Sequence, residues 1–156
     1  MDILLWRHAE AEPGEPDEGR ILTSKGVRQA QKMAHWLERN LPSRCRILVS
    51  PTVRTVQTAQ ALERKYKLCP EIAPDATAEA LLAAANWPDC KEPVLLVGHQ
   101  PTLGQAAALL LTGSVQNWTI RKANVWWIAR RERDGDSDGD GGNYLKAVVA
   151  PDLVMK

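Results

Sequence analysis

The sequence predicts an α/β fold, a three-layer sandwich with a mostly parallel central sheet flanked by helices. Two observations predict it. Short apolar, β-prone runs alternate with segments of helical periodicity. These runs are apolar throughout, as in strands that are buried on both faces. The 156 residues, 44% hydrophobic and 25% charged, have the length and balance of one domain, which we expect to span residues 1–156.

The first elements follow from local patterns. Residues 2–6 predict a buried strand, and residues 11–21, rich in Pro and Gly, predict a loop. Thr23 or Ser24 is expected to cap a helix that Pro42 ends. The expected apolar face of this helix consists of Val27, Ala30, Met33, Ala34 and Leu37.

The middle of the chain repeats this alternation. Residues 47–49 predict a second buried strand. Ser50 and Pro51 then form a favourable Ncap–N1 pair for a helix through about Tyr66. A weak strand at 69–72 and an Ala-rich helix at 75–86 complete this part.

Residues 93–98 predict the clearest strand, and a helix follows from Pro101 to Leu111, closed by Gly113. Two strands are expected at 123–130 and 143–149, joined by an Asp/Gly-rich hairpin connection at 134–142. Residues 134–139 match the first half of a calcium-loop pattern. Leu145 stands where that pattern requires Glu, so a solvated hairpin is favoured over calcium binding.

Composition narrows the classes of function. Formal net charge is +1, with 20 Lys and Arg against 19 Asp and Glu, so we expect no nucleic-acid partner. Three widely spaced cysteines without a CxxC pair indicate a reducing compartment. The amino terminus lacks a signal-peptide pattern, and no apolar run approaches the ~20 residues of a membrane span. We therefore expect a cytoplasmic protein with no membrane partner.

Unusual polar residues follow three of the predicted strands. Ligands of open α/β sheets bind beyond the carboxyl ends of the strands, so these residues should converge on one crevice. Each residue alone has an ordinary structural explanation, and the prediction depends on their coincidence. Two imidazoles and two guanidiniums there would attract a phosphoryl dianion. The residues are Arg7 and His8 after the first strand, Ser50 and Arg54 after the second, and His99 and Gln100 after the fourth.

At these positions the chain resembles the histidine phosphatase, or phosphoglycerate-mutase-like, superfamily, and within it the SixA-type phosphohistidine phosphatases. Four motifs carry the resemblance: Leu5–Ala11 with the Arg-His signature, Leu22–Ala30, Ser50–Thr58, and Val97–Pro101 with the second histidine. They occur in the family's order. Ala9 departs from the usual Gly after the Arg-His pair. The segment between residues 67 and 92 is too short for the helical lid of the larger relatives.

The resemblance implies a role for each matching residue. His8 would be the nucleophile on phosphorus. Arg7, Arg54, His99 and Gln100 would contact the phosphoryl group, and Asp75 is the best match for a proton donor. A histidine with a pKa near ~6.5 offers an unprotonated nitrogen at neutral pH. The arginines would supply the countercharge, so neither a metal nor a cofactor is expected.

The expected reaction is phosphate removal through a phosphohistidine intermediate, with phosphate anion as product. The missing lid and the uncertain acid favour phosphohistidine on a signalling or phosphocarrier protein as the substrate, because a protonated imidazole leaves readily. One alternative is a small-molecule phosphomonoesterase of the same fold. A second is a non-catalytic phosphate-binding module.

Overall fold

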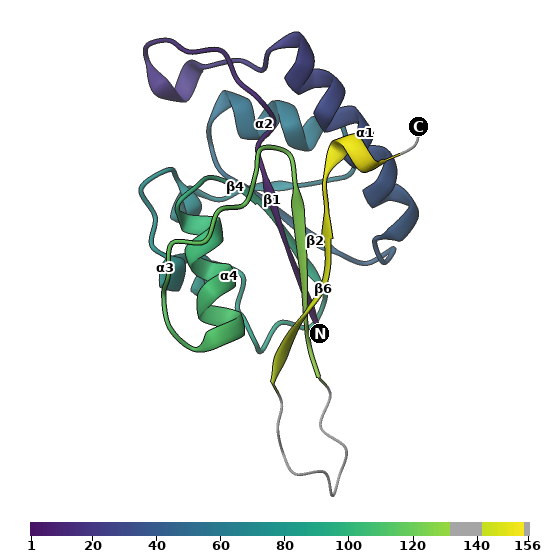
Figure 1. Cartoon of the computed structure of the whole chain (residues 1–156), viewed down its shortest axis with the longest axis vertical. Helices are drawn as coiled ribbons and strands as arrows, with labels where there is room; N and C mark the ends of the chain where they lie inside the picture. Colours follow the sequence, from purple (N-terminus) through teal and green to yellow (C-terminus); the bar gives the residue numbers. More distant parts are fainter. Residues whose placement is uncertain (132–141, 155–156) are drawn as a thin grey trace, which may run out of the picture.

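A six-stranded sheet forms the centre of the protein, and helices cover both of its faces (Figure 1). The structure is a computed structural model that describes residues 1–131 and 142–154. The strands are β1 (Asp2–Arg7), β2 (Arg46–Val49), β3 (Lys67–Leu68), β4 (Val94–Gly98), β5 (Val125–Arg130) and β6 (Asn143–Val149). The helices are α1 (Ser24–Asn40), α2 (Val53–Gln60), α3 (Ala78–Ala84) and α4 (Thr102–Thr112), with 3-10 turns η1 (Asp17–Gly19), η2 (Pro70–Ile72) and η3 (Pro151–Leu153).

The strand order is β3-β2-β4-β1-β5-β6, which confirms the predicted α/β sandwich with a mostly parallel sheet. Pairing is parallel from β3 through β1 and antiparallel on both sides of β5. The register places Arg7 opposite Gly98 and Val49 opposite Val97. The residues that follow β1, β2 and β4 therefore emerge side by side at one edge of the sheet.

The alternation of β1 divides the core into two layers. Leu4 and Trp6 face the cluster formed with α1 and α2, whereas Ile3 and Leu5 face the cluster formed with α3 and α4. All four side chains are fully buried. Both faces of β1 and β4 are thus buried, which explains the apolar runs in these two strands.

Two details of the first helices differ from the sequence-based expectation. Thr23 caps α1 by accepting a hydrogen bond from the Gly26 amide at 2.9 Å, as predicted. Val27 is 42% exposed, and Gly26 takes its place on the buried face, because the α1 backbone packs closely on the Glu10 carbonyl. The apolar pattern alone does not reveal that close approach.

The second helix begins later and ends earlier than predicted. Thr52, not Ser50, is its N-cap, and Thr52 and Thr55 form a capping box. The Ser50 hydroxyl is instead engaged with His99. The helix ends at Gln60 rather than near Tyr66, and Glu63 adopts a left-handed backbone with φ of 56°.

Three further boundaries are corrected. The third strand is Lys67–Leu68 rather than 69–72, where η2 forms instead. The Ala-rich helix covers only Ala78–Ala84, because Thr77 caps it. The fourth helix covers Thr102–Thr112, and Gly113, which is left-handed with φ of 85°, closes it as predicted.

The predicted hairpin connection at 134–142 and its calcium-like pattern lie almost wholly outside the described residues. The strands β5 and β6 on either side pair as expected for a hairpin. Among the helices of the described ranges, none has the length and apolar character needed to cross a membrane.

Replacing Gly26 with Ala should destabilise the protein by about 1–3 kcal/mol. The added Cβ would collide with the Glu10 carbonyl oxygen, so α1 would have to shift. This loss should outweigh the roughly 1 kcal/mol that Ala gains over Gly in helix propensity. Urea unfolding measures the change, with Gly19→Ala as the matched control, since a Cβ there meets only the Pro16 side chain at ordinary distance. An unfolding free energy equal to wild type for Gly26→Ala would contradict this packing.

Candidate active site

Hydrogen bonds from two neighbouring elements fix the backbone at His8. Its amide donates to the Gly98 carbonyl of β4 at 3.1 Å. The next amide, of Ala9, donates to the Thr58 hydroxyl of α2 at 3.0 Å, and that hydroxyl donates to the Arg54 carbonyl. The His8 side chain is buried at 7% exposure. The turn after β1 is therefore held by both β4 and α2, and the imidazole has a defined place.

The hydrogen bond of Nδ1 fixes the tautomer of His8. Nδ1 lies 2.7 Å from the Ala9 carbonyl oxygen, which can only accept, so Nδ1 carries the proton and donates. Burial, together with the smaller effect of the charges of Arg54 and Arg7, lowers the pKa of His8 to about 4, although the Ala9 hydrogen bond opposes the shift. The ring is neutral at physiological pH, and Nε2 keeps its lone pair.

His99 lies next to His8, with ring centroids 5.4 Å apart. Its Nδ1 is 3.4 Å from Nη2 of Arg54, and its Nε2 is 2.8 Å from the Ser50 hydroxyl. Because a guanidinium only donates, Nδ1 accepts here, and Nε2 donates to Ser50. Burial lowers the pKa of His99 to about 3, helped by the charges of His8 and Arg54.

Arg54 brings a nearly buried positive charge to the two imidazoles. Its side chain is 4% exposed, and its guanidinium donates to the Asp17 carbonyl at 2.8 Å and to the Asp17 carboxylate at 3.0 Å. The Nε atom of Arg54 is buried and has no hydrogen-bond partner. Each buried N–H of a guanidinium requires an acceptor. Asp17 provides acceptors for Nη1 and Nη2 of Arg54 but not for Nε.

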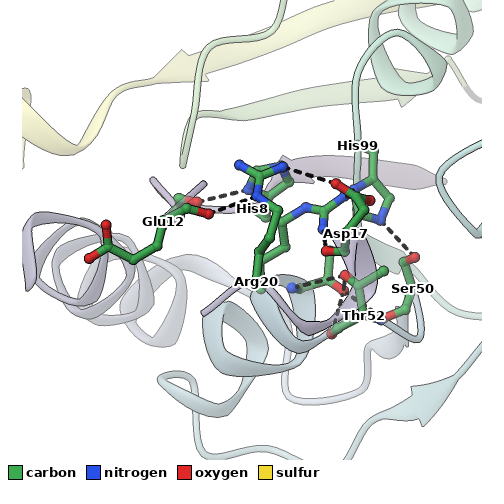
Figure 2. A network of polar contacts seen from close by, with 10 residues as sticks. His8, Glu12, Asp17, Arg20, Ser50, Thr52 and His99 are labelled. Carbon is green, nitrogen blue, oxygen red and sulfur yellow. Dashed lines mark hydrogen bonds and ion pairs between the residues drawn. The ribbon is translucent and has the colours of Figure 1, made fainter. Parts of the chain in front are cut away.

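Sequence reasoning did not find Asp17 or Arg20, which lie in the loop between β1 and α1. Arg20 donates from Nε to the Glu12 carbonyl at 2.7 Å and from Nη1 to the Asp17 carboxylate at 3.1 Å (Figure 2). Hydrogen bonds to Arg20 and Arg54 hold the pKa of Asp17 below its usual range. The sequence signal for Arg20 is an Arg in a Pro/Gly-rich loop just before the capped helix. Its importance is visible only in the structure, where the loop folds back onto Arg54.

Two glutamines of the quoted motifs hold this loop in place. The Gln29 side chain accepts from the Glu10 amide at 3.0 Å, and the Gln57 side chain accepts from the Leu22 amide at 2.8 Å. The ends of the loop are thus tied to α1 and α2. These motif residues position the site without themselves contacting the imidazoles through any hydrogen bond in residues 1–131 and 142–154.

Arg7 directly precedes His8 at the end of β1. Its Nη1 donates to the Ile120 carbonyl at 3.0 Å, and its Nε is buried without a partner. Burial lowers the pKa of Arg7 from its ordinary value. Arg7 and Arg54 thus share one feature: each keeps a buried N–H free near His8.

Both polar atoms of the Gln100 side chain form hydrogen bonds within the protein. Its amide oxygen accepts from the Gly104 amide at 2.8 Å, and its nitrogen donates to the Trp118 carbonyl at 2.9 Å. Both ends of the side chain are therefore committed to the start of α4 and to the loop that follows it. A substrate contact of Gln100 stays a prediction.

Asp75 is not joined to the other predicted residues. It is exposed in the turn before α3, and in the described part of the chain no hydrogen bond or ion pair connects it to His8, Arg54 or His99. The same region touches the site only indirectly, through the Thr102 hydroxyl, which donates to the Ala76 carbonyl at 2.7 Å. The role of Asp75 as acid stays a prediction.

The assembled geometry is suited to a tetrahedral anion. The charges of Arg7 and Arg54 act on a neutral imidazole with a free lone pair, each arginine has a buried Nε without a partner, and Arg54 already binds the Asp17 carboxylate. Within residues 1–131 and 142–154, no group of three or more His, Cys, Asp or Glu side chains is arranged to hold a metal ion. The fold and site together define an α/β protein with a buried, neutral imidazole close to two arginines.

Comparison with known proteins identifies the class. Residues 3–77 match the histidine phosphatase superfamily, branch 1. The phosphohistidine phosphatase SixA of Escherichia coli K12 is 29% identical over 122 residues, covering 72% of this chain and 76% of SixA. An uncharacterised protein of Picosynechococcus is 32% identical over an alignment of 169 residues that covers 99% of both chains.

Solved structures agree in fold. The protein histidine phosphatase SixA complexed with tungstate superposes with a TM-score of 0.75 at 23% identity over 97% of each chain. A mycobacterial glucosyl-3-phosphoglycerate phosphatase superposes with a TM-score of 0.68 at 17% identity, over 93% of this chain and 96% of that one. The chain belongs to the histidine phosphatase superfamily, in its SixA-type group, and is a phosphatase.

The imidazole signals of His8 and His99 should not titrate near pH 6.5 in the free protein, because burial lowers their pKa values to about 4 and about 3. Proton NMR measures this, with His8→Ala and His35→Ala assigning the signals. The unfolded chain takes up these protons near ~6.5 whereas the folded chain does not, so the free energy of unfolding should fall as pH decreases through this window. Titration midpoints near ~6.5 for both residues would contradict the assigned burial.

Proposed function

We propose that this phosphatase works through a covalent phosphohistidine on His8 Nε2. One observation carries the proposal. The Ala9 carbonyl binds the Nδ1 proton of a buried, neutral imidazole, so the lone pair of Nε2 is available beside two arginines. A nucleophile for phosphorus needs such an unprotonated nitrogen with a fixed direction. The same hydrogen bond would later stabilise the positive charge of the phosphorylated ring.

Arg7 and Arg54 would bind the phosphoryl oxygens. Each has a buried Nε–H without a partner, and a guanidinium matches the geometry of a phosphoryl group. The substrate would displace the Asp17 carboxylate from Arg54, because a dianion competes well with a half-exposed monoanion. These groups would stabilise the charge that spreads over the equatorial oxygens in the transition state.

His99 would contribute through a change of tautomer. In the structure its Nδ1 accepts from Arg54, so it does not donate toward an anion. The Ser50 hydroxyl can donate as well as accept. When the His99 proton moves from Nε2 to Nδ1, this hydroxyl can therefore change from acceptor to donor and keep its hydrogen bond to Nε2. Ser50 is in this proposal a positioning residue that lets His99 donate to a phosphoryl oxygen without losing its other hydrogen bond.

The reaction has two steps. First, the lone pair of His8 Nε2 forms a bond to phosphorus while the bond from phosphorus to the leaving group breaks, and the leaving group takes up a proton. Water then attacks phosphorus, the bond to Nε2 breaks, and inorganic phosphate is released. Each step is easier than direct hydrolysis. The arginines provide the countercharge, so the proposal requires no divalent metal.

The supply of protons favours a phosphohistidine substrate. Asp17 is paired with two arginines, which keeps its pKa low and makes it a poor acid at neutral pH. Asp75 is exposed and outside the hydrogen-bonded network. An imidazole leaving group, with a conjugate acid near pKa ~6.5, can be protonated by solvent, whereas an alkoxide needs a positioned acid. We therefore propose phosphohistidine on a signalling or phosphocarrier protein, as the name of the Escherichia coli relative also suggests.

A small-molecule phosphomonoesterase is the second candidate function. The fold of the glucosyl-3-phosphoglycerate phosphatase favours it, since that enzyme shares the architecture and acts on a small phosphate ester. For such a substrate, Asp75 would have to move to the site and act as the acid.

A substrate panel with chelator present should separate these functions. We expect kcat/KM for a phosphorylated histidine-phosphotransfer domain to exceed that for common sugar and glycerate phosphates by at least about 100-fold, because only the imidazole leaves without a positioned acid. Brief exposure to the phosphorylated domain followed by acid-free quenching should leave an acid-labile phosphate on the enzyme. His8→Ala should abolish both turnover and label.

The control is Asp75→Asn, which should leave turnover of the phosphorylated domain within about twofold of wild type, since solvent supplies the proton. Fast hydrolysis of phosphate esters with no action on phosphohistidine would reject the proposed substrate, whereas the proposed covalent intermediate on His8 would stand. Phosphate binding without any label on His8 would reject the catalytic proposal in favour of a binding module.

A further inference from the structure

A cation-rich groove lies beside the active site, between the start of α1, the segment before β5 and the turn η3. Its volume is about 950 Å³. Two carboxylates, Glu10 and Asp152, also line it. Because the whole chain has a formal net charge of only +1, this groove holds a strong local excess of positive charge. Its six cations, which define the basic groove, are Arg7, Lys25, Arg28, Lys32, Arg121 and Lys122.

The basic groove borders the catalytic residues at Arg7. Arg7 lines the groove and directly precedes His8 in the chain. The segment before β5 forms another wall of the groove and is hydrogen-bonded to Arg7. The Asn124 carbonyl accepts from the Arg7 amide at 3.2 Å, and Asn124 also lines the groove. A molecule that presents a phosphoryl group to His8 and Arg7 would therefore have the basic groove beside it.

The cations on α1 occupy positions that the helix itself disfavours. Lys25 lies in the first turn, where the helix dipole favours anions, and that turn has no acidic residue. Lys25 and Arg28 are three residues apart, and Arg28 and Lys32 four, so like charges are neighbours on one helix face. In the described ranges, none of these three forms an ion pair. A bound anionic surface would remove this repulsion.

The form of the groove favours a macromolecular partner over a small anion. Lys25, Arg28, Arg121 and Lys122 are exposed and come from two separate segments, whereas a small anion site would use buried donors. Leu153, 77% exposed, adds an apolar contact at the rim. Exposed charges on two walls with an apolar contact between them fit a folded protein surface.

We propose that the basic groove docks the acidic surface that surrounds the phosphohistidine of the protein substrate. This inference rests on the proposed function and deepens it, because it assigns the residues that select a protein over a free phosphorylated compound. Exposed cations at the rim of an interface act mainly on the association rate, and their effect decreases with salt.

The test measures kcat/KM for a phosphorylated histidine-phosphotransfer domain with acidic residues around its histidine, and for free phosphohistidine. Lys25→Glu/Arg28→Glu and Arg121→Glu/Lys122→Glu should each reduce kcat/KM for the domain by roughly tenfold or more. Turnover of free phosphohistidine should stay within about twofold, since neither pair touches the catalytic residues. The loss should shrink at high salt and when the carboxylates around the phosphohistidine are changed to amides.

Folding of the variants is checked independently. Lys25→Glu/Arg28→Glu should leave the melting temperature unchanged or raise it, because a carboxylate suits the first turn of α1. The matched control is Arg44→Glu/Lys91→Glu, which reverses two exposed charges before β2 and β4, at the opposite edge of the sheet from His8. This control should leave both substrates unaffected.

The outcomes separate the two proposals. If wild type dephosphorylates the domain and the groove variants do so equally well, docking at the basic groove is rejected and the proposed function stands. If the variants lose activity equally on free phosphohistidine, the cations act on the phosphoryl group itself and docking is again rejected. Tighter competition by a single-stranded oligonucleotide than by the unphosphorylated domain would reassign the groove to nucleic acid. If the wild-type protein acts on no phosphohistidine, the proposed substrate and the proposed docking at the basic groove are both rejected.

Discussion

The structure depends on a positive charge that the fold buries without a complete set of partners. The guanidinium of Arg54 is 4% exposed and lies against His99. Burying such a charge is unfavourable unless an anion accompanies it. In the unliganded protein that anion is the Asp17 carboxylate, which is half exposed and is shared with Arg20. A phosphoryl group would satisfy the same charge more fully, and this difference drives substrate binding in our account.

The neutral imidazoles follow from the same constraint. A charged His8 or His99 would add positive charge to a buried cluster that already holds Arg54 and Arg7, so burial and repulsion keep both rings unprotonated. The Ala9 carbonyl then decides which nitrogen of His8 keeps its lone pair. In our proposal, burial and the nearby cations thus prepare this nitrogen as the nucleophile, and no adjacent base is required to activate it.

Two kinds of structure position the site, with different rigidity. The parallel register of β1, β2 and β4 places His8, Ser50 and His99 at one edge, and the dry sheet makes these positions firm. Asp17 and Arg20 come from a loop that Gln29 and Gln57 hold near its ends and that Arg54 holds at Asp17. In our proposal the Asp17 carboxylate leaves Arg54 while the imidazoles, which follow strands of the sheet, stay in place. The basic groove lies on the side of Arg7, so docking need not disturb this exchange.

The sequence alone predicted the α/β fold and the meeting of His8, Arg54 and His99, because ends of parallel strands share an edge whatever the details of packing. The sequence pattern misplaced the N-cap of α2 at Ser50. In the structure the Ser50 hydroxyl bonds to His99, which follows the distant strand β4, and Thr52 caps the helix instead. The structural role of Gln100 likewise depends on Trp118, which only the folded chain brings near.

A crystal structure of the protein with tungstate tests the central claim most directly, since this oxyanion has the shape and charge of phosphate. The account predicts tungsten facing His8 Nε2, with its oxygens bound by Arg7 and Arg54 and with Asp17 displaced from Arg54. Tungstate bound elsewhere, or an unchanged Asp17–Arg54 pair beside an empty His8, would contradict it.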